Sequence, residues 1–224
     1  MPVINMNIQI LYDNNARGGF KAGWGFSCFV KISGENILFD TGWDGNILIH
    51  NMKTANINPE EIDKIFISHS DWDHIGGLNH ILKYRNEPEI YVLESLSINL
   101  KNELKRYGNV VEISKSGKIC ENVWTTGELG EKIKEQSMIV KTEKGNIILT
   151  GCAHPGLENI IEKSRDFGEI YAVIGGFHGS NVDILKGIPV VMPCHCTEKI
   201  EEIKNVMPES YKSCEAGFNL FIGD

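Results

Sequence analysis

Four side chains of the kinds that bind divalent metals fall within six residues. They are His69, Asp71, Asp73 and His74, and they follow the apolar run Ile65–Ile67. A strand leading into a tight polar loop would point His69, Asp71 and Asp73 to one side, with His74 opening a helix beside them. Imidazole and carboxylate groups bind divalent transition metals at neutral pH. A solvated loop with an aspartate capping a helix is the alternative, but it does not explain so dense a grouping.

Three more histidines, His154, His178 and His195, each follow an apolar run that is typical of a strand. The three runs cover residues 146–150, 170–174 and 188–192. In layered α/β proteins, polar groups at strand ends meet at one edge of a sheet, even when they are remote in sequence. One histidine after a strand is usually structural, but three that complete a four-ligand loop favour a metal site.

Residues 69–74 resemble the His-x-His-x-Asp-His signature of the metallo-beta-lactamase superfamily, and Gly76-Gly77-Leu78 follows as in many of its members. Asp71 stands where the second histidine is usual, so a nitrogen ligand is replaced by an oxygen ligand. Harder ligands favour harder ions, so we expect zinc, with iron or manganese as alternatives. The flavodiiron branch has a similar substitution, but it also needs a flavodoxin-like domain, for which this chain has no room.

The later motifs narrow the resemblance to one branch of that superfamily. They are Gly-Cys-Ala-His-Pro-Gly at 151–156, Gly-Gly-Phe-His at 175–178 and Pro-Cys-His-Cys-Thr at 193–197. This branch takes its name from archaeal synthases that join a dihydropterin to ribofuranosyl-aminobenzene phosphate in methanopterin biosynthesis. Many of its members are uncharacterised metal-dependent hydrolases. The likeness extends from about residue 8 to residue 222.

The resemblance implies two cations and assigns ligands to each. His69 and Asp71 would hold the first cation, Asp73 and His74 the second, and His195 would take the place of the final histidine on the second. It also implies that Asp40, in Asp40-Thr41-Gly42, supports the metal loop from behind, a role compatible with capping a strand-to-helix turn.

Two positions depart from the superfamily pattern. The usual middle histidine has no counterpart, because Glu128 stands in its place, either as a replacement ligand or as a surface acid. Cys152 occupies the place of the bridging carboxylate, so either Cys152 or His154 could coordinate. We favour His154, because a thiolate is a soft ligand beside Asp71 and Asp73.

We assign His178 to catalysis or substrate contact, with metal coordination as the alternative. A neutral imidazole at the rim of a pocket can act as acid or base near pH 7, whereas a metal-bound imidazole cannot.

Three functions compete. The first is a dinuclear metal-dependent hydrolase that activates water against an ester, amide or phosphoester, with Asp73 orienting the water and His178 protonating the leaving group. The second is a transferase that joins a dihydropterin pyrophosphate to an arylamine, which the absence of an obvious polybasic phosphate cradle disfavours. The third is a binding protein that has lost a metal, with Asp71 and Glu128 as the traces of that loss.

The elements expected to carry these residues alternate between strands and helices. Together with the resemblance, this alternation implies an α/β fold in which two facing mixed sheets are covered outside by helices, a four-layer αβ/βα sandwich. The expected strands are 3–12, 24–32, 37–39, 63–68, 89–93, 110–113, 119–126, 137–143 and 146–150, with 170–174 and 188–192 later, and the expected helices are 44–56, 58–61, 75–83 and 95–107.

Length, composition and charge limit the number of domains and the classes of partner that we expect. The 224 residues suit a single domain over 1–224, and 42% hydrophobic with 23% charged residues is ordinary for a globular protein. A net charge of −8 argues against a nucleic-acid surface, so we expect a small-molecule substrate. With no long apolar run and no signal-peptide pattern at residues 1–5, we expect a cytoplasmic protein without membrane contact. We expect its cysteines to be free thiols: Cys28, Cys120, Cys152, Cys194, Cys196 and Cys214.

Overall fold

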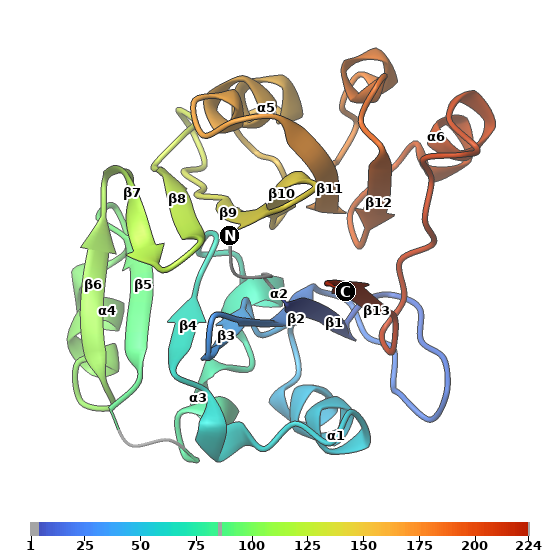
Figure 1. The fold of residues 1–224 in the computed structure, drawn as a ribbon. Helices are drawn as coiled ribbons and strands as arrows, with labels where there is room; N and C mark the ends of the chain where they lie inside the picture. The colour runs from blue at the N-terminus through green and yellow to red at the C-terminus, as the bar shows by residue number, and fades with distance from the viewer. Residues whose placement is uncertain (1–4, 85–86, 224) are drawn as a thin grey trace.

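The computed structural model describes residues 5–84 and 87–223, and it contains two β-sheets that face each other (Figure 1). The first sheet has seven strands in the order β13-β1-β2-β3-β4-β5-β6. Its strands are β1 (Met6–Tyr12), β2 (Ser27–Ile32), β3 (Glu35–Phe39), β4 (Lys64–Phe66), β5 (Glu89–Leu93), β6 (Asn109–Ile113) and β13 (Asn219–Ile222).

The second sheet has six strands in the order β12-β11-β10-β9-β8-β7. Its strands are β7 (Lys115–Cys120), β8 (Val123–Gly127), β9 (Met138–Thr142), β10 (Gly145–Thr150), β11 (Ile170–Gly176) and β12 (Val190–Cys194). Both sheets are mixed, because antiparallel hairpins adjoin the parallel sets β3-β4-β5-β6 and β10-β11-β12.

Helices cover the outer face of each sheet, so the expected four-layer sandwich is confirmed (Figure 1). On the first sheet lie α1 (Gly45–Thr54), α3 (Leu78–Ile81) and α4 (Ile98–Leu104), and on the second lie α5 (Leu157–Arg165), η2 (Val182–Leu185) and α6 (Ile200–Val206). The remaining helical turns are η1 (Pro59–Glu61) and α2 (Trp72–Ile75).

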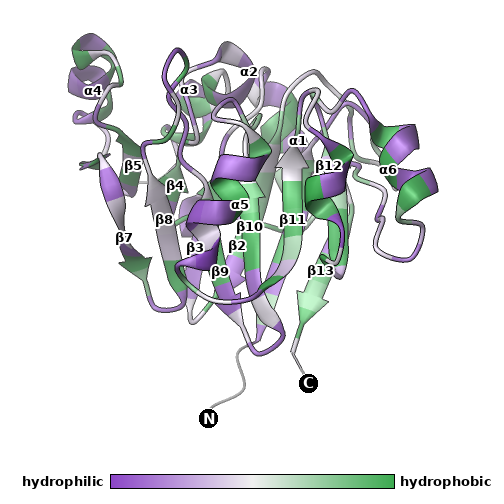
Figure 2. Cartoon of the chain, turned by 90° about the horizontal axis from the view of Figure 1, so that it is seen from above, coloured by the Kyte–Doolittle hydropathy of each residue, from purple (hydrophilic) through white to green (hydrophobic). Residues whose placement is uncertain are grey.

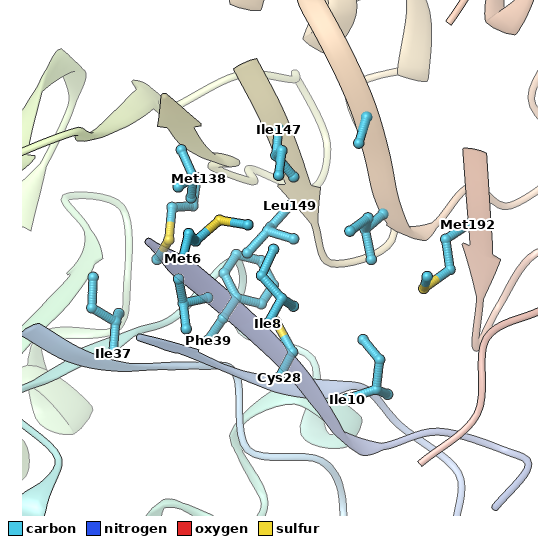
Figure 3. Packing of buried hydrophobic residues seen from close by; sticks show 14 of the residues in the cluster. Met6, Ile8, Ile10, Cys28, Ile37, Phe39, Met138, Ile147, Leu149 and Met192 are labelled. Atoms are coloured by element: carbon cyan, nitrogen blue, oxygen red, sulfur yellow. The ribbon is translucent and has the colours of Figure 1, made fainter. Parts of the chain in front are cut away.

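The main core lies between the two sheets, and it follows from the alternation of side chains along each strand. Figure 3 shows Phe39 of the first sheet and Leu149 of the second among the side chains that fill this layer. The neighbours Leu38 and Ile148 point the other way and pack beneath the outer helices. Because successive strand residues face opposite sides, one apolar strand serves two layers.

The carboxyl ends of the parallel strands lie at one edge of the sandwich. Figure 2 shows β11 pointing to the end of the molecule at which α2 lies. The loops after β3, β4, β10, β11 and β12 therefore gather there, and they carry the residues that the sequence singled out. Strand ends of this kind are where α/β proteins place their ligands.

Several expected elements are divided or shortened in the structure. Strand 24–32 begins only at Ser27, and 119–126 is a hairpin in which Asn122 has a φ of 62°. Helix 75–83 is replaced by α2 and α3, since Gly76 and Gly77 lie against neighbouring backbone: a Cβ there would come within 2.2 Å of the Trp43 carbonyl oxygen and 2.4 Å of the Thr41 carbonyl oxygen. The part of strand 3–12 that precedes residue 5 lies outside the described residues.

The expectation that all cysteines are free is wrong for one pair. Cys194 and Cys214 form a disulfide with their Cα atoms 5.2 Å apart, and it joins the end of β12 to the segment that leads into β13. The chain folds Cys214 back beside β12 through the parallel pairing of Tyr211 with Val191, which sequence spacing does not reveal. The other four cysteines are free. Across residues 5–84 and 87–223, no helix is both long and apolar enough to cross a membrane.

Candidate metal centre

His69, Asp71 and His154 form one half of the candidate centre. The Asp71 Oδ2 atom lies 3.5 Å from His69 Nε2 and 3.3 Å from His154 Nε2, and the rings of the two histidines are 4.7 Å apart. His69 lies in the loop after β4, and His154 in the loop after β10. Asp71 is the N-cap residue of α2, but its side chain makes no capping hydrogen bond, so the capping alternative does not explain it.

Asp73, His74 and His195 form the other half. His195 Nε2 lies 3.0 Å from Asp73 Oδ2, and the His195 ring is 5.3 Å from the ring of His74. The two halves are adjacent, because the His69 and His74 rings are 4.1 Å apart. Side chains that are up to 126 positions apart in the chain, from 69 to 195, therefore meet at one place.

Cys152 lies between the two halves. Its Sγ atom is 3.2 Å from His74 Nε2. Ligand atoms within 4.8 Å of one another join Cys152 to His69 and His154, and a second such group joins it to His74 and His195. The sequence left a choice between Cys152 and His154, but the fold brings both to the site.

Asp40 supports both halves from behind, as the resemblance implied. Its carboxylate accepts hydrogen bonds from the Ser68 backbone N–H at 2.7 Å and from the Ser68 hydroxyl at 2.6 Å. It also lies 2.7 Å from His74 Nδ1. The Ser68 hydroxyl in turn is 2.8 Å from His69 Nδ1. These contacts fix the rings of His69 and His74 so that their Nε2 atoms face the site.

Glu135, which the sequence did not single out, holds the loop that carries Cys152 and His154. Its buried carboxylate accepts the Thr150 hydroxyl and four successive backbone N–H groups, those of residues 151 to 154, at 2.7 to 3.2 Å. No local spacing marks this residue, because its partners are backbone groups in a distant loop.

His195 is held by four neighbours. Its Nδ1 atom accepts the Gly25 backbone N–H at 3.2 Å and lies 3.1 Å from Asn14 Oδ1. Asp13 accepts the His195 backbone N–H at 2.8 Å. The exposed ring of Trp24 packs edge-on against the His195 ring, with the centroids 4.8 Å apart. The contact from Gly25 leaves His195 Nε2 directed at Asp73.

The fixed charges of the site favour a cation. Burial opposes the charged form of His69, but the carboxylates of Asp71, Glu135 and Asp40 outweigh it and raise its pKa to about 9. Burial would raise the pKa of Asp73, yet the contact with His195 holds it well below its usual range. Four carboxylates thus surround the histidines, and a metal ion can replace the protons that they attract.

The residues present fit a metal. The Nε2 atoms of His69, His154 and His178 are buried without a hydrogen-bond partner, although buried polar atoms almost always have one. Carboxylates and imidazoles of this kind are the donors that Zn²⁺, Fe²⁺ and Mn²⁺ accept. Two of these nitrogens, those of His69 and His154, lie 3.5 and 3.3 Å from Asp71 Oδ2, so one cation held among the three side chains would satisfy both.

His178 lies next to His154, at the edge of the group of candidate ligands. Its ring is 4.8 Å from that of His154, and its ligand atom groups with Cys152 and Cys196. It also lines a cavity of about 470 Å³ together with His154. This position suits contact with a substrate.

Glu128 does not join the site. Its carboxylate instead accepts the Ser95 backbone N–H at 2.6 Å. This contact favours an acid that does not bind metal over a replacement for the missing histidine ligand.

The backbone of the site is strained. Among the described residues, eight other than glycine have a positive φ, and four of them are Asp40, Ala153, His178 and His195. Residues other than glycine rarely adopt this backbone conformation, and those that do so cluster at functional sites.

Comparison with known proteins places these observations in a family. The sequence pattern of the metallo-beta-lactamase superfamily matches residues 25–181. A 7,8-dihydropterin-6-methyl-4-(beta-D-ribofuranosyl)-aminobenzene-5'-phosphate synthase of Methanocaldococcus jannaschii is 28% identical, over 94% of this chain and 93% of that protein.

Solved structures share the fold. Tm1679, a metal-dependent hydrolase of the beta-lactamase superfamily, is 25% identical and gives a TM-score of 0.78 over 98% of this chain and all of that one. A diphosphatase from the PhnP family gives a TM-score of 0.71 at 14% identity, over 99% of this chain and 98% of that one, which is a likeness of fold alone.

Proposed function

Because the chain belongs to the metallo-beta-lactamase superfamily, we propose that it is a metal-dependent hydrolase that acts on an ester, amide or phosphoester of a small molecule. The observation that carries this proposal is the convergence of unsatisfied histidine nitrogens and carboxylates from remote strand ends. The ligands of the first cation are His69, Asp71 and His154, and those of the second are Asp73, His74 and His195. Zinc is the proposed cation, with iron or manganese as alternatives because of Asp71.

The residues of the chain divide the remaining work. Bound divalent cations supply Lewis acidity toward a substrate oxygen and acidify water at neutral pH. Asp73 orients the attacking water, because its carboxylate lies 3.0 Å from the Nε2 atom of His195, a ligand of the same cation. His178 donates a proton to the leaving group from its place beside His154. Asp40 and Glu135 keep the ligands in place.

Replacing Asp73 by Asn tests this assignment. Asp73→Asn should lower the turnover of chromogenic ester, amide and phosphoester substrates by about a hundredfold or more, because the neutral amide is a poor ligand and accepts less strongly from water. The far-ultraviolet circular dichroism should not change. Asp166→Asn, which alters only an exposed ion pair with Lys163, is the control. Retained turnover in metal-loaded Asp73→Asn protein would count against the assignment.

A transferase is the second candidate, and the archaeal synthase that resembles nearly the whole chain favours it. Incubation of metal-loaded protein with a dihydropterin pyrophosphate and an arylamine should then give a coupled product. If no product forms while ester or phosphoester hydrolysis proceeds, the transferase is excluded. Elemental analysis below one ion per chain, with no activity after addition of zinc, iron or manganese, would instead favour a binding protein.

A further inference from the structure

The loop between β8 and β9 is fixed at its base and open at its tip. Leu129 and Glu135 pair as an antiparallel bridge, with backbone hydrogen bonds of 2.9 and 3.0 Å in the two directions. The carboxylate of Glu135 binds the loop of Cys152 and His154, and the next residue, Gln136, binds the Ser68 carbonyl oxygen through its backbone N–H. The loop is therefore tied to both strand-end loops that carry the candidate ligands, and its tip has a defined place beside them.

The tip borders a cavity of about 480 Å³ that opens beside Asp71. Its walls include Trp72, Leu96 and Leu100 on one side and Lys132 and Lys134 from the tip. On the other side of the tip, a second cavity of about 740 Å³ reaches His154, and Lys132 lines this one too. Both cavities are of the size that holds a small molecule.

Lys132 and Lys134 give the cavity beside Asp71 a positive charge in an otherwise acidic chain. Neither Lys132 nor Lys134 forms an ion pair with any residue in the described ranges. The carboxylates that face the same cavities are Asp71, which is engaged by two histidines, and Glu131. Two ammonium groups one residue apart suit a doubly charged anion, and lysine is a common phosphate-binding residue.

Apolar side chains are exposed at the same cavity beside Asp71. Trp72 is 61% exposed and Ile133 is 38% exposed, and both line the cavity beside Asp71. A large apolar side chain exposed next to a cavity favours contact with a ligand, because covering it removes apolar area from water. The indole of Trp72 offers a flat face to a planar group.

We propose that this cavity binds the phosphate-bearing part of the substrate, an organic phosphate with an aromatic group. Lys132 and Lys134 pair with the phosphate, and Trp72 and Ile133 pack against the aromatic group. The reacting bond then lies toward Asp71 and His154. This inference deepens the proposed function and rests on it for the reaction, but not for the binding.

Binding of 1-naphthyl phosphate tests the inference, measured by isothermal titration calorimetry at low salt. The double variant Lys132→Met/Lys134→Met keeps the side-chain stems and removes both charges, and it should bind about tenfold more weakly than the unchanged protein. Lys141→Met, at an exposed position of β9, should bind as the unchanged protein does. Trp72→Ala should weaken binding of 1-naphthyl phosphate but not of inorganic phosphate.

Three outcomes would overturn the inference: no binding by the unchanged protein, equal binding by the double variant, or equal affinity for uncharged 1-naphthol. The titration is repeated on protein treated with a chelator, where the difference between unchanged protein and double variant should persist. Failure of hydrolysis with that difference intact would refute the proposed function alone. Hydrolysis with no such difference would refute the subsite alone.

Discussion

Five donors converge on the buried carboxylate of Glu135, and they set how Cys152 and His154 face the other ligands. Burial alone would raise the pKa of Glu135, but the charge of His69 and the His154 backbone N–H outweigh it and lower that pKa. The carboxylate therefore stays charged and accepts from every donor around it. Charged acceptors with several N–H partners contribute more than neutral ones.

Replacing Glu135 by Gln should destabilise the protein by about 1–3 kcal/mol. The amide nitrogen would face an N–H donor of residues 151 to 154, because both carboxylate oxygens accept backbone hydrogen bonds. Urea unfolding measures the loss, and Glu143→Gln, in an exposed turn, should change stability by less than about 0.5 kcal/mol. Equal stability of Glu135→Gln and the unchanged protein would show that these hydrogen bonds do not hold the loop.

Sequence reasoning reached the residues that a local motif or a position directly after a strand marks, such as His69, His154 and His195, and missed Glu135. The spacing of His69, Asp71, Asp73 and His74 was informative because the four lie in one loop and turn. Glu135 was missed, since a carboxylate that binds distant backbone groups leaves no pattern in the chain.

At the scale of elements, three neighbouring parallel strands are joined by one lysine. Lys64 of β4 lies 2.6 Å from Glu35 of β3 and 3.2 Å from Glu89 of β5, measured from Nζ to the carboxylate oxygens. β4 leads directly into the loop of His69, so this group anchors the strand that positions the site. Burial would lower the pKa of Lys64, but the two carboxylates outweigh it and raise it above 10.5.

Replacing Lys64 by Met should lower the free energy of unfolding by about 1 kcal/mol at pH 7. Because the pKa of Lys64 is raised in the folded state, its contribution is fully present below pH 10.5 and is lost as the pH rises through the folded value. The difference between Lys64→Met and the unchanged protein should therefore shrink in strong alkali. Lys31→Met, at an exposed position of β2, is the control. A difference that is constant up to high pH would contradict this account.

The element boundaries that sequence patterns misplaced lie where tertiary contacts override local preference. The helix expected over 75–83 is interrupted because Gly76 and Gly77 lie against the segment after β3. The strand expected over 119–126 turns at Asn122, a residue type that tolerates positive φ. In both segments the hydrophobic pattern of the sequence runs on through the residue at which the element ends, because the contacts that end it come from distant parts of the chain.

At the scale of the whole molecule, the centre depends on two sheets keeping their edges aligned. His69 and His74 come from the first sheet, and His154 and His195 come from the second. Next to His195, the disulfide between Cys194 and Cys214 joins the end of β12 in the second sheet to the segment that leads into β13 of the first. The layered fold followed from the resemblance and the alternation of elements, whereas this bridge could not be predicted because its two cysteines meet only after folding.

Replacing Cys214 by Ser should lower the free energy of unfolding by about 3 kcal/mol, because the disulfide closes a loop of 20 residues and restricts the unfolded chain. Urea unfolding with and without dithiothreitol measures this. The reductant should destabilise the unchanged protein by a similar amount and leave Cys214→Ser unaffected. An unchanged protein that is insensitive to the reductant would contradict a stabilising disulfide.

The central claim is that two cations lie between ligands from both sheets. Anomalous diffraction from crystals of the metal-loaded protein, measured at the zinc, iron and manganese edges, tests it most directly. The account predicts two peaks, one among His69, Asp71 and His154 and the other among Asp73, His74 and His195. Crystals of protein soaked in these metals that show no anomalous peak among these residues would contradict it.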